Sequence, residues 1–221
     1  MVRKVLAVGA HPDDVELGLG GTIARHRDEG DEVFVLVLSR GEKGVGDATI
    51  GLAGLSEREK LEIKGRIREK ETKNALKILG IKEDYVKVLG FPDSGIQATE
   101  ETLGKVSQLV KDVSPDIVYT HFPRDLHSDH VSTSIITIHA GRKVKNLIFY
   151  ESPSTCTNFS PNFFINISDY IAKKLEALRM HETQKDKPYM ERDAILSKAR
   201  FRGFQAGVLY AEAFVAYRIV Y

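Results

Sequence analysis

The sequence is poor in the features that mark secreted, membrane-bound or nucleic-acid-binding proteins. Its 221 residues include one cysteine and no tryptophan. A single cysteine excludes an intrachain disulfide and fits a reducing compartment, so we expect a cytoplasmic protein. No apolar run approaches the roughly 20 residues that cross a bilayer, so we expect no membrane partner. The formal net charge of +1 gives no global field that would favour nucleic acid.

Length and composition suit one sizeable hydrophobic core. The chain is 42% hydrophobic and 29% charged, and we expect a single domain over residues 1–221. Short apolar runs alternate with stretches of helical periodicity. The expected strands lie at residues 2–9, 32–39, 85–89, 116–122 and 146–151, and the expected helices at 22–29, 56–79, 100–113 and 129–140. This order predicts an α/β, Rossmann-like, mostly parallel sheet with helices on both faces.

The last 70 residues are less regular and read as a C-terminal α/β extension. We expect a strand at 163–167, a helix that is capped by Ser168 and runs to Met180, a helix at 191–202 and a final strand at 213–221. This extension is expected to wall the functional site and to contribute to specificity.

Glycine gathers in two segments. Residues 40–57 form a long, glycine-rich connection, which is typical of a functional lid. Gly65 is expected to interrupt the helix that follows. The run Gly18-Leu-Gly-Gly does not match the dinucleotide fingerprint directly after a strand, and no acid suited to a ribose ends the second strand. Close packing of a helix on the sheet explains this run better.

Side chains that bind metals follow the first strand directly. The run Ala10-His-Pro-Asp-Asp14 places His11, Asp13 and Asp14 at the carboxyl end of that strand, where ligands bind in open α/β sheets. Crowding these groups together is costly unless a cation lies between them. We therefore interpret them as half of a metal site.

A second cluster, His127-Ser-Asp-His130, follows the fourth strand. His127 and His130 are three residues apart, so a helical turn places both on one face. Zinc favours imidazole nitrogen and carboxylate oxygen, and catalytic sites keep one position open. We predict His11, Asp14 and His130 as the metal ligands.

The remaining polar groups then take catalytic roles. Asp13 is next to the predicted ligand Asp14 but is not itself a ligand. It is therefore free to move a proton between water and a leaving group. His127 is predicted to stabilise an oxyanion, and Asp129 to hold an imidazole that binds the metal. These parts are typical of a hydrolase for an amide or an ester.

Each piece also has a structural explanation. His-Pro-Asp-Asp suits a turn, and His130 alone suits a partly buried helix position. Two such clusters at strand ends favour a metal. His26, His121 and His139 are not assigned to the site, because one lies on a charged helix, one ends a strand and one lies late in a helix.

The sequence resembles the PIG-L/LmbE-like zinc-dependent deacetylases, which act on N-acetylglucosamine-type substrates. Ala10-His-Pro-Asp-Asp14 resembles the first family motif, and His127-Ser-Asp-His130 resembles the second, with Ser128 where proline is usual. Weaker matches occur at Arg68-x-x-Glu71 and Gly90-Phe-Pro-Asp93, and in the tail at His181-x-x-Gln184 and Ala211-Glu-Ala-Phe214. A tyrosine that some members carry near the second motif has no counterpart here.

The resemblance implies the same metal ligands, Asp13 as general base and acid, and His127 as the oxyanion donor. It also implies sugar contacts, for which Arg68, Asp93 and His181 are candidates. The alternatives are a solvated helix face for Arg68, a turn for Asp93 and a helix cap for His181. Glu212 is open between a structural role and a subunit contact.

The expected function is removal of the N-acetyl group from a small amino-sugar conjugate, with release of acetate. Zinc is the expected cofactor, although iron or cobalt suits the same ligands. The resemblance further implies a homo-oligomer such as a hexamer. One alternative is a zinc hydrolase of another small acyl-amide. The other is a non-catalytic metal- or nucleotide-binding module with a Rossmann-like crevice.

Overall fold

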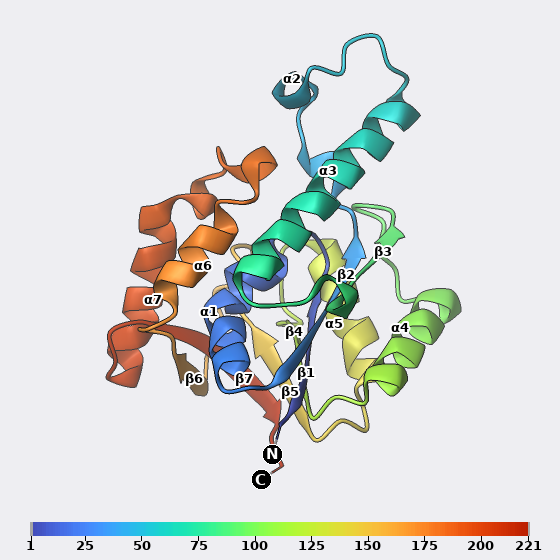
Figure 1. Ribbon diagram of the computed structural model, residues 1–221. Helices are drawn as coiled ribbons and strands as arrows, with labels where there is room; N and C mark the ends of the chain where they lie inside the picture. The colour runs from blue at the N-terminus through green and yellow to red at the C-terminus, as the bar shows by residue number, and fades with distance from the viewer. Residues whose placement is uncertain (1, 221) are drawn as a thin grey trace.

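The structure is a computed structural model that describes residues 2–220. Its seven-stranded sheet has the order β3-β2-β1-β4-β5-β7-β6 (Figure 1). The strands are β1 (Lys4–Gly9), β2 (Glu32–Ser39), β3 (Val86–Phe91), β4 (Ile117–His121), β5 (Asn146–Tyr150), β6 (Phe163–Asn166) and β7 (Ala211–Arg218). Strands β1 to β5 are parallel, whereas β7 is antiparallel to β5 and to β6. The predicted mostly parallel sheet is confirmed.

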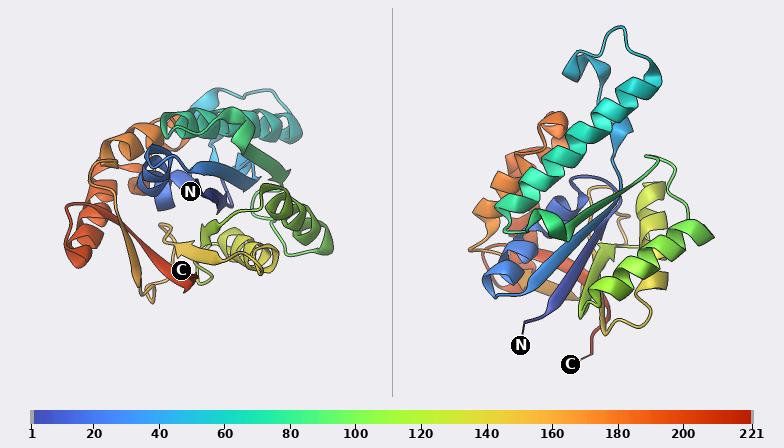
Figure 2. Two further views of the ribbon diagram at one scale, coloured as in Figure 1. Left: turned by 60° about the horizontal axis from the view of Figure 1, so that its bottom comes forward. Right: turned by 45° about the vertical axis from the view of Figure 1, so that its right-hand side comes forward.

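Helices cover both faces of this sheet, as the left view of Figure 2 shows. They are α1 (Asp14–Asp28), α2 (Asp47–Ile50), α3 (Glu57–Ile78), α4 (Glu100–Val113), α5 (Ser128–Ala140), α6 (Ile171–Leu178) and α7 (Arg192–Ala206). Alternate residues of β1 separate two cores. Val5 and Ala7 pack toward α1, α3 and α6, whereas Leu6 and Val8 pack toward α4 and α5. No helix among residues 2–220 is both long and apolar enough to cross a membrane.

The chain places its site at the point where the order of strands reverses. Strand β1 lies between β2 and β4, so successive crossovers leave it in opposite directions. In such sheets the carboxyl ends of the two central strands border a crevice. The segments after β1 and β4 carry the two predicted clusters, and α1 and α5 begin there.

Two expected details of the helices are wrong. Helix α3 continues through Gly65, since the lack of a side chain there lets Arg40 pack against the helix. Ser168 does not cap α6, which begins at Ile171. Its hydroxyl instead donates to Asn166 Oδ1 at 2.6 Å and accepts from the Tyr210 amide at 3.1 Å. The expected end of the last strand at Tyr221 lies outside the described residues.

Helix α1 is broken at Leu19, where φ is −148°. The Lys174 ammonium group donates to the free carbonyl of Leu17 at 2.8 Å and pairs with Glu212 at 2.5 Å. The Glu212 carboxylate accepts the free amides of Gly21 and Thr22 at 3.0 and 2.7 Å. Glu212 thus has the structural role that was one of its two predicted alternatives, because this buried ion pair satisfies the interrupted backbone.

Gly18 leaves room for a fully buried ring. A Cβ atom at Gly18 would clash with the ring of Tyr150, whose hydroxyl donates to the Val8 carbonyl at 2.9 Å. We expect Gly18→Ala to lower the free energy of unfolding by about 1–3 kcal/mol through overpacking. The matched control is Gly104→Ala on exposed α4, where a Cβ meets nothing and should add about 0.5–1 kcal/mol of stability. Urea denaturation of both variants checks this, and equal effects would contradict it.

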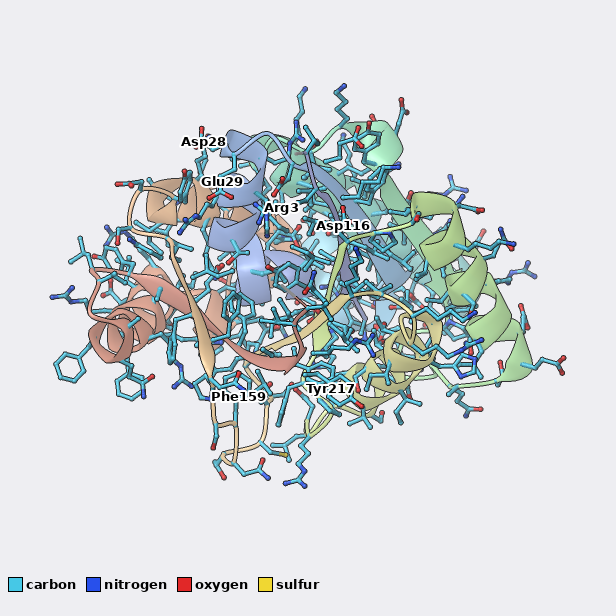
Figure 3. The ribbon with its side chains drawn as sticks, turned by 90° about the horizontal axis from the view of Figure 1, so that it is seen from below. Arg3, Asp28, Glu29, Asp116, Phe159 and Tyr217 are labelled. Carbon is cyan, nitrogen blue, oxygen red and sulfur yellow. The ribbon has the colours of Figure 1, made fainter. Side chains whose placement is uncertain are left out.

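An ion-pair network lies at the amino ends of β1 and β2, where Figure 3 labels Arg3 and Glu29 close together. Arg3 pairs with Glu29 at 2.7 Å and with Asp31 at 2.6 Å. His26 contacts Asp31 at 2.7 Å and the Tyr119 hydroxyl at 3.1 Å. These carboxylates already have arginine partners, so His26 belongs to a structural cluster, and the structure keeps it away from the predicted site.

Candidate active site

A cavity of about 420 Å³ opens at the carboxyl ends of β1 and β4. Seven of the nine predicted site residues line it, namely His11, Asp13, Asp14, Arg68, Asp93, His127 and His130. Asp129 and His181 lie behind its wall. Because the two clusters come from segments more than 100 residues apart, only the parallel order of β1 and β4 brings them together.

Three predicted metal ligands form a compact group. Donor atoms of His11, Asp14 and His130 all lie within 4.8 Å of one another. The Asp14 carboxylate lies between the rings, 3.4 Å from His11 Nδ1 and 3.3 Å from His130 Nε2. Burial raises the pKa of Asp14, but His130 and His121 outweigh burial and hold this pKa well below its usual range.

The outer nitrogen of each ring is held by a carboxylate. His11 Nε2 donates to Asp129 Oδ2 at 3.0 Å, as the role predicted for Asp129 requires, and His130 Nδ1 contacts Asp125 Oδ1 at 3.2 Å. A carboxylate only accepts, so these two nitrogens carry protons. The other two nitrogens, His11 Nδ1 and His130 Nε2, face Asp14 and are the ones that a metal would engage after they lose their protons. This donor set fits a divalent transition metal.

A second group of potential ligands, His11, His127 and Asp129, overlaps the first. The Asp129 carboxylate is already engaged, since it accepts the amides of Ser94 at 2.8 Å and Ile96 at 3.2 Å. The Asp129 amide in turn donates to His127 Nδ1 at 3.2 Å. These bonds favour the first group for the metal.

Asp13 holds a strained backbone conformation beside the metal group. Its φ is +102°, which for a residue other than glycine costs about 1–3 kcal/mol. Such strain is common at functional sites and turns the carboxylate into the cavity, which it lines. Burial raises the pKa of Asp13 to about 6, against the opposing charge of Arg68. A carboxylate with this pKa is suited to exchange protons near neutral pH.

Arg68 contacts the predicted base directly. Its buried guanidinium pairs with Asp13 Oδ2 at 3.0 Å and donates to the Gly41 carbonyl at 2.8 Å. The alternative of a solvated helix face does not hold for Arg68, which extends from α3 into the cavity. Asp93 also lines the cavity, 3.4 Å from His11 Nε2, and accepts the amide of Lys43 at 2.8 Å.

His127 faces the cavity as a hydrogen-bond donor. It precedes α5, and its Nδ1 accepts the Asp129 amide, so the single proton of the neutral ring resides on Nε2. Burial and the neighbouring rings of His11 and His130 lower the pKa of His127, which favours the neutral form.

His181 does not reach the cavity. It is fully buried, and its Nε2 lies 3.2 Å from Glu16 Oε1. The expected contact with substrate is therefore not available to it, because Glu16 and the end of α6 enclose the ring. Burial lowers the pKa of His181, but the charge of Glu16 outweighs burial and raises it.

Two site residues were not predicted. His121 was not assigned to the site, yet it stacks on His130 with ring centres 4.0 Å apart and lies 3.2 Å from Asp14 Oδ2. Its place as the last buried residue of β4 was the available signal. Asp125 was not assigned to the site either, yet its carboxylate contacts His130 and accepts the Ser152 and Ser154 hydroxyls at 2.6 Å.

Known proteins share this architecture and much of this sequence. An uncharacterized deacetylase of Escherichia coli strain K12 is 32% identical over 82% of this chain and 91% of its own. Diacetylchitobiose deacetylase of Thermococcus kodakarensis is 30% identical over 96% of this chain and 82% of its own. The solved structure of a conserved protein of Thermus thermophilus superposes with a TM-score of 0.81 at 32% identity, covering 100% of this chain and 97% of that one.

The family model for GlcNAc-PI de-N-acetylases, PIG-L, matches residues 6–141. This match covers more than half of the chain and contains both clusters of the site. It also contains the strands β1 and β4 that bring them together. The chain belongs to the PIG-L family of de-N-acetylases.

Proposed function

We propose that this protein is a metal-dependent hydrolase that removes the acetyl group from a small N-acetylglucosamine-type substrate. One observation carries the proposal: the convergence of His11, Asp14 and His130 beside an Asp13 carboxylate that faces the same cavity. The activity that names the Thermococcus kodakarensis relative, diacetylchitobiose deacetylase, supports an amino-sugar substrate.

The three ligands would hold zinc, which favours imidazole nitrogen and carboxylate oxygen. Iron or cobalt is the alternative. When bound, the cation would polarise the acetyl carbonyl and lower the pKa of a water molecule. Asp129 and Asp125 would keep the two rings oriented through their outer nitrogens.

Asp13 moves the proton in this scheme. As a base it accepts a proton from the water that attacks the acetyl carbon, and as an acid it gives this proton to the amide nitrogen. The carbon–nitrogen bond then breaks, releasing acetate and a free amino sugar. Arg68 holds the Asp13 carboxylate in place during both transfers.

His127 donates a hydrogen bond from its Nε2–H to the carbonyl oxygen as negative charge develops there. Asp93 and the outer edge of Arg68 border the same cavity and are the proposed partners for sugar hydroxyls. His181 is reassigned from the substrate to Glu16, whose carboxylate lies 3.2 Å from its Nε2. The expected homo-oligomer and cytoplasmic location stay predictions.

The direct test is acetate release from free N-acetylglucosamine, diacetylchitobiose and the malate and inositol conjugates of N-acetylglucosamine. We expect hydrolysis of at least one compound, loss of activity after chelation and return with zinc. Enzymatic quantification of acetate beside metal analysis checks this. If protein with stoichiometric metal hydrolyses none of these compounds, the substrate is not an amino sugar of this kind. Unchanged turnover by metal-free protein would refute the metal dependence.

A further inference from the structure

A second cavity of about 170 Å³ adjoins the catalytic cavity. Leu17, Pro153 and Tyr189 line both cavities, which therefore share part of their walls. Helices α6 and α7 and strand β7 form the rest of its wall, at the edge of the molecule drawn in orange and red in Figure 1. We call this space, bounded by Leu17, Lys174, Ile195, Lys198, Arg202 and Ala213, the α7 compartment.

The floor of the α7 compartment is apolar. Leu17 and Ile195 belong to one buried cluster, and the methyl groups of Ala199, Ala211 and Ala213 complete the lining. Small side chains at these positions leave the space open instead of filling it. Such a surface favours the carbon skeleton of a ligand, because contact with it removes apolar area from water.

Charged groups border this floor, and both carboxylates among them are already satisfied. Glu151 accepts two bonds from Arg202, at 2.8 and 3.2 Å. Glu212 accepts Lys174 and two backbone amides. Both acids are thus already paired, and Glu151 Oε2 forms a further, longer ion pair with Lys198 Nζ at 3.7 Å.

Lys198 is the third cation of the α7 compartment and makes one hydrogen bond. Its ammonium group donates to the Glu151 carbonyl at 3.1 Å, while the nearest Glu151 carboxylate oxygen is 3.7 Å away, beyond hydrogen-bond distance. The Lys198 side chain is 40% exposed, so its remaining donors are accessible to a ligand. An ammonium group has three donors, so two remain for an anion.

We infer that the α7 compartment binds the group attached to the amino sugar, and that it selects a compact group with an apolar carbon skeleton and a carboxylate placed against Lys198. This inference rests on the proposed function, since it names the substrate class of the same site. The shared wall at Leu17, Pro153 and Tyr189 sets the path between the sugar and this anchor.

The test compares N-acetylglucosaminyl malate with its dimethyl ester, in which two methyl ester groups replace the two carboxylates. We expect the wild-type protein to favour the acid in kcat/KM by about tenfold, as one charge-assisted hydrogen bond provides. Lys198→Met should reduce this ratio to about one. Lys173→Met, on the exposed side of α6, is the matched control and should keep the wild-type ratio. A ratio that Lys198→Met leaves unchanged would overturn the inference.

Failure of the proposed function is distinguishable from failure of this inference. If neither compound is hydrolysed, calorimetric binding of glucosaminyl malate still tests the anchor. We then expect its Kd to rise about tenfold in Lys198→Met and to stay unchanged in Lys173→Met. Equal affinity of both variants would refute the anchor irrespective of any catalysis.

A cavity-filling pair tests the occupant. Ala194→Phe at the rim of the α7 compartment should lower kcat/KM for the malate conjugate more than for free N-acetylglucosamine, whereas Ser197→Phe on the same helix lies outside the lining and should not. If Ala194→Phe instead blocks N-butyrylglucosamine selectively and leaves the preference for the acid intact, the compartment receives an acyl chain. That result would overturn the assignment.

Discussion

Replacing Asp13 by asparagine should lower kcat by about 10²–10⁴-fold while zinc stays bound, because general acid–base catalysis contributes about this much. Asp13 lines the cavity, is no member of the three-ligand group and has its pKa raised to about 6 by burial. An amide keeps the shape of the carboxylate and removes its capacity to accept a proton. Steady-state kinetics with parallel metal analysis checks both parts.

The substitution suits this position for a further reason. Asparagine tolerates positive φ better than most residues, so the +102° at residue 13 should persist. Asp84→Asn, an exposed surface change, is the matched control and should leave both kcat and metal content unchanged. Near-normal turnover of Asp13→Asn would show that another group moves the proton.

The sheet was predictable because its central strands β1, β2, β4 and β5 are buried on both faces. Such strands are continuous apolar runs, and all five parallel strands begin and end within two residues of the predicted positions. The prediction failed where tertiary contacts decide local structure. Gly65 does not break α3, and the space left by its missing side chain is occupied by Arg40. Ser168 has cap-forming chemistry, but a pairing with Tyr210 engages it elsewhere.

The metal ligands were predictable because they follow the ends of two strands in the sequence. His11, Asp14 and His130 lie close after the ends of β1 or β4 in the chain. The groups that orient them were harder to assign, because the partner of a polar side chain is set by loops that sequence does not place. Asp125 reaches His130 through such a loop, and Arg68 contacts Asp13 although it lies on a helix rich in charge.

Replacing Asp14 by asparagine should weaken the binding of zinc, whereas Asp13→Asn should leave zinc bound. Asp14 places its carboxylate between His11 and His130 and supplies the negative charge of the ligand group. An amide there leaves two imidazoles without an anion. We expect the affinity for zinc to fall by more than about 100-fold, since even partners outside the ligand set contribute about 10–100-fold. Deacetylation should fall with it.

Competition with a chromophoric chelator measures this affinity, and Asp129→Asn makes the comparison decisive. His11, His127 and Asp129 form the overlapping group, so a metal held there would be lost from Asp129→Asn and kept by Asp14→Asn. We expect the reverse order, with a smaller loss in Asp129→Asn, because Asp129 acts through the outer nitrogen of His11. Full zinc affinity in Asp14→Asn would show that the overlapping group of His11, His127 and Asp129 binds the metal. Asp14 would then be only the first residue of α1.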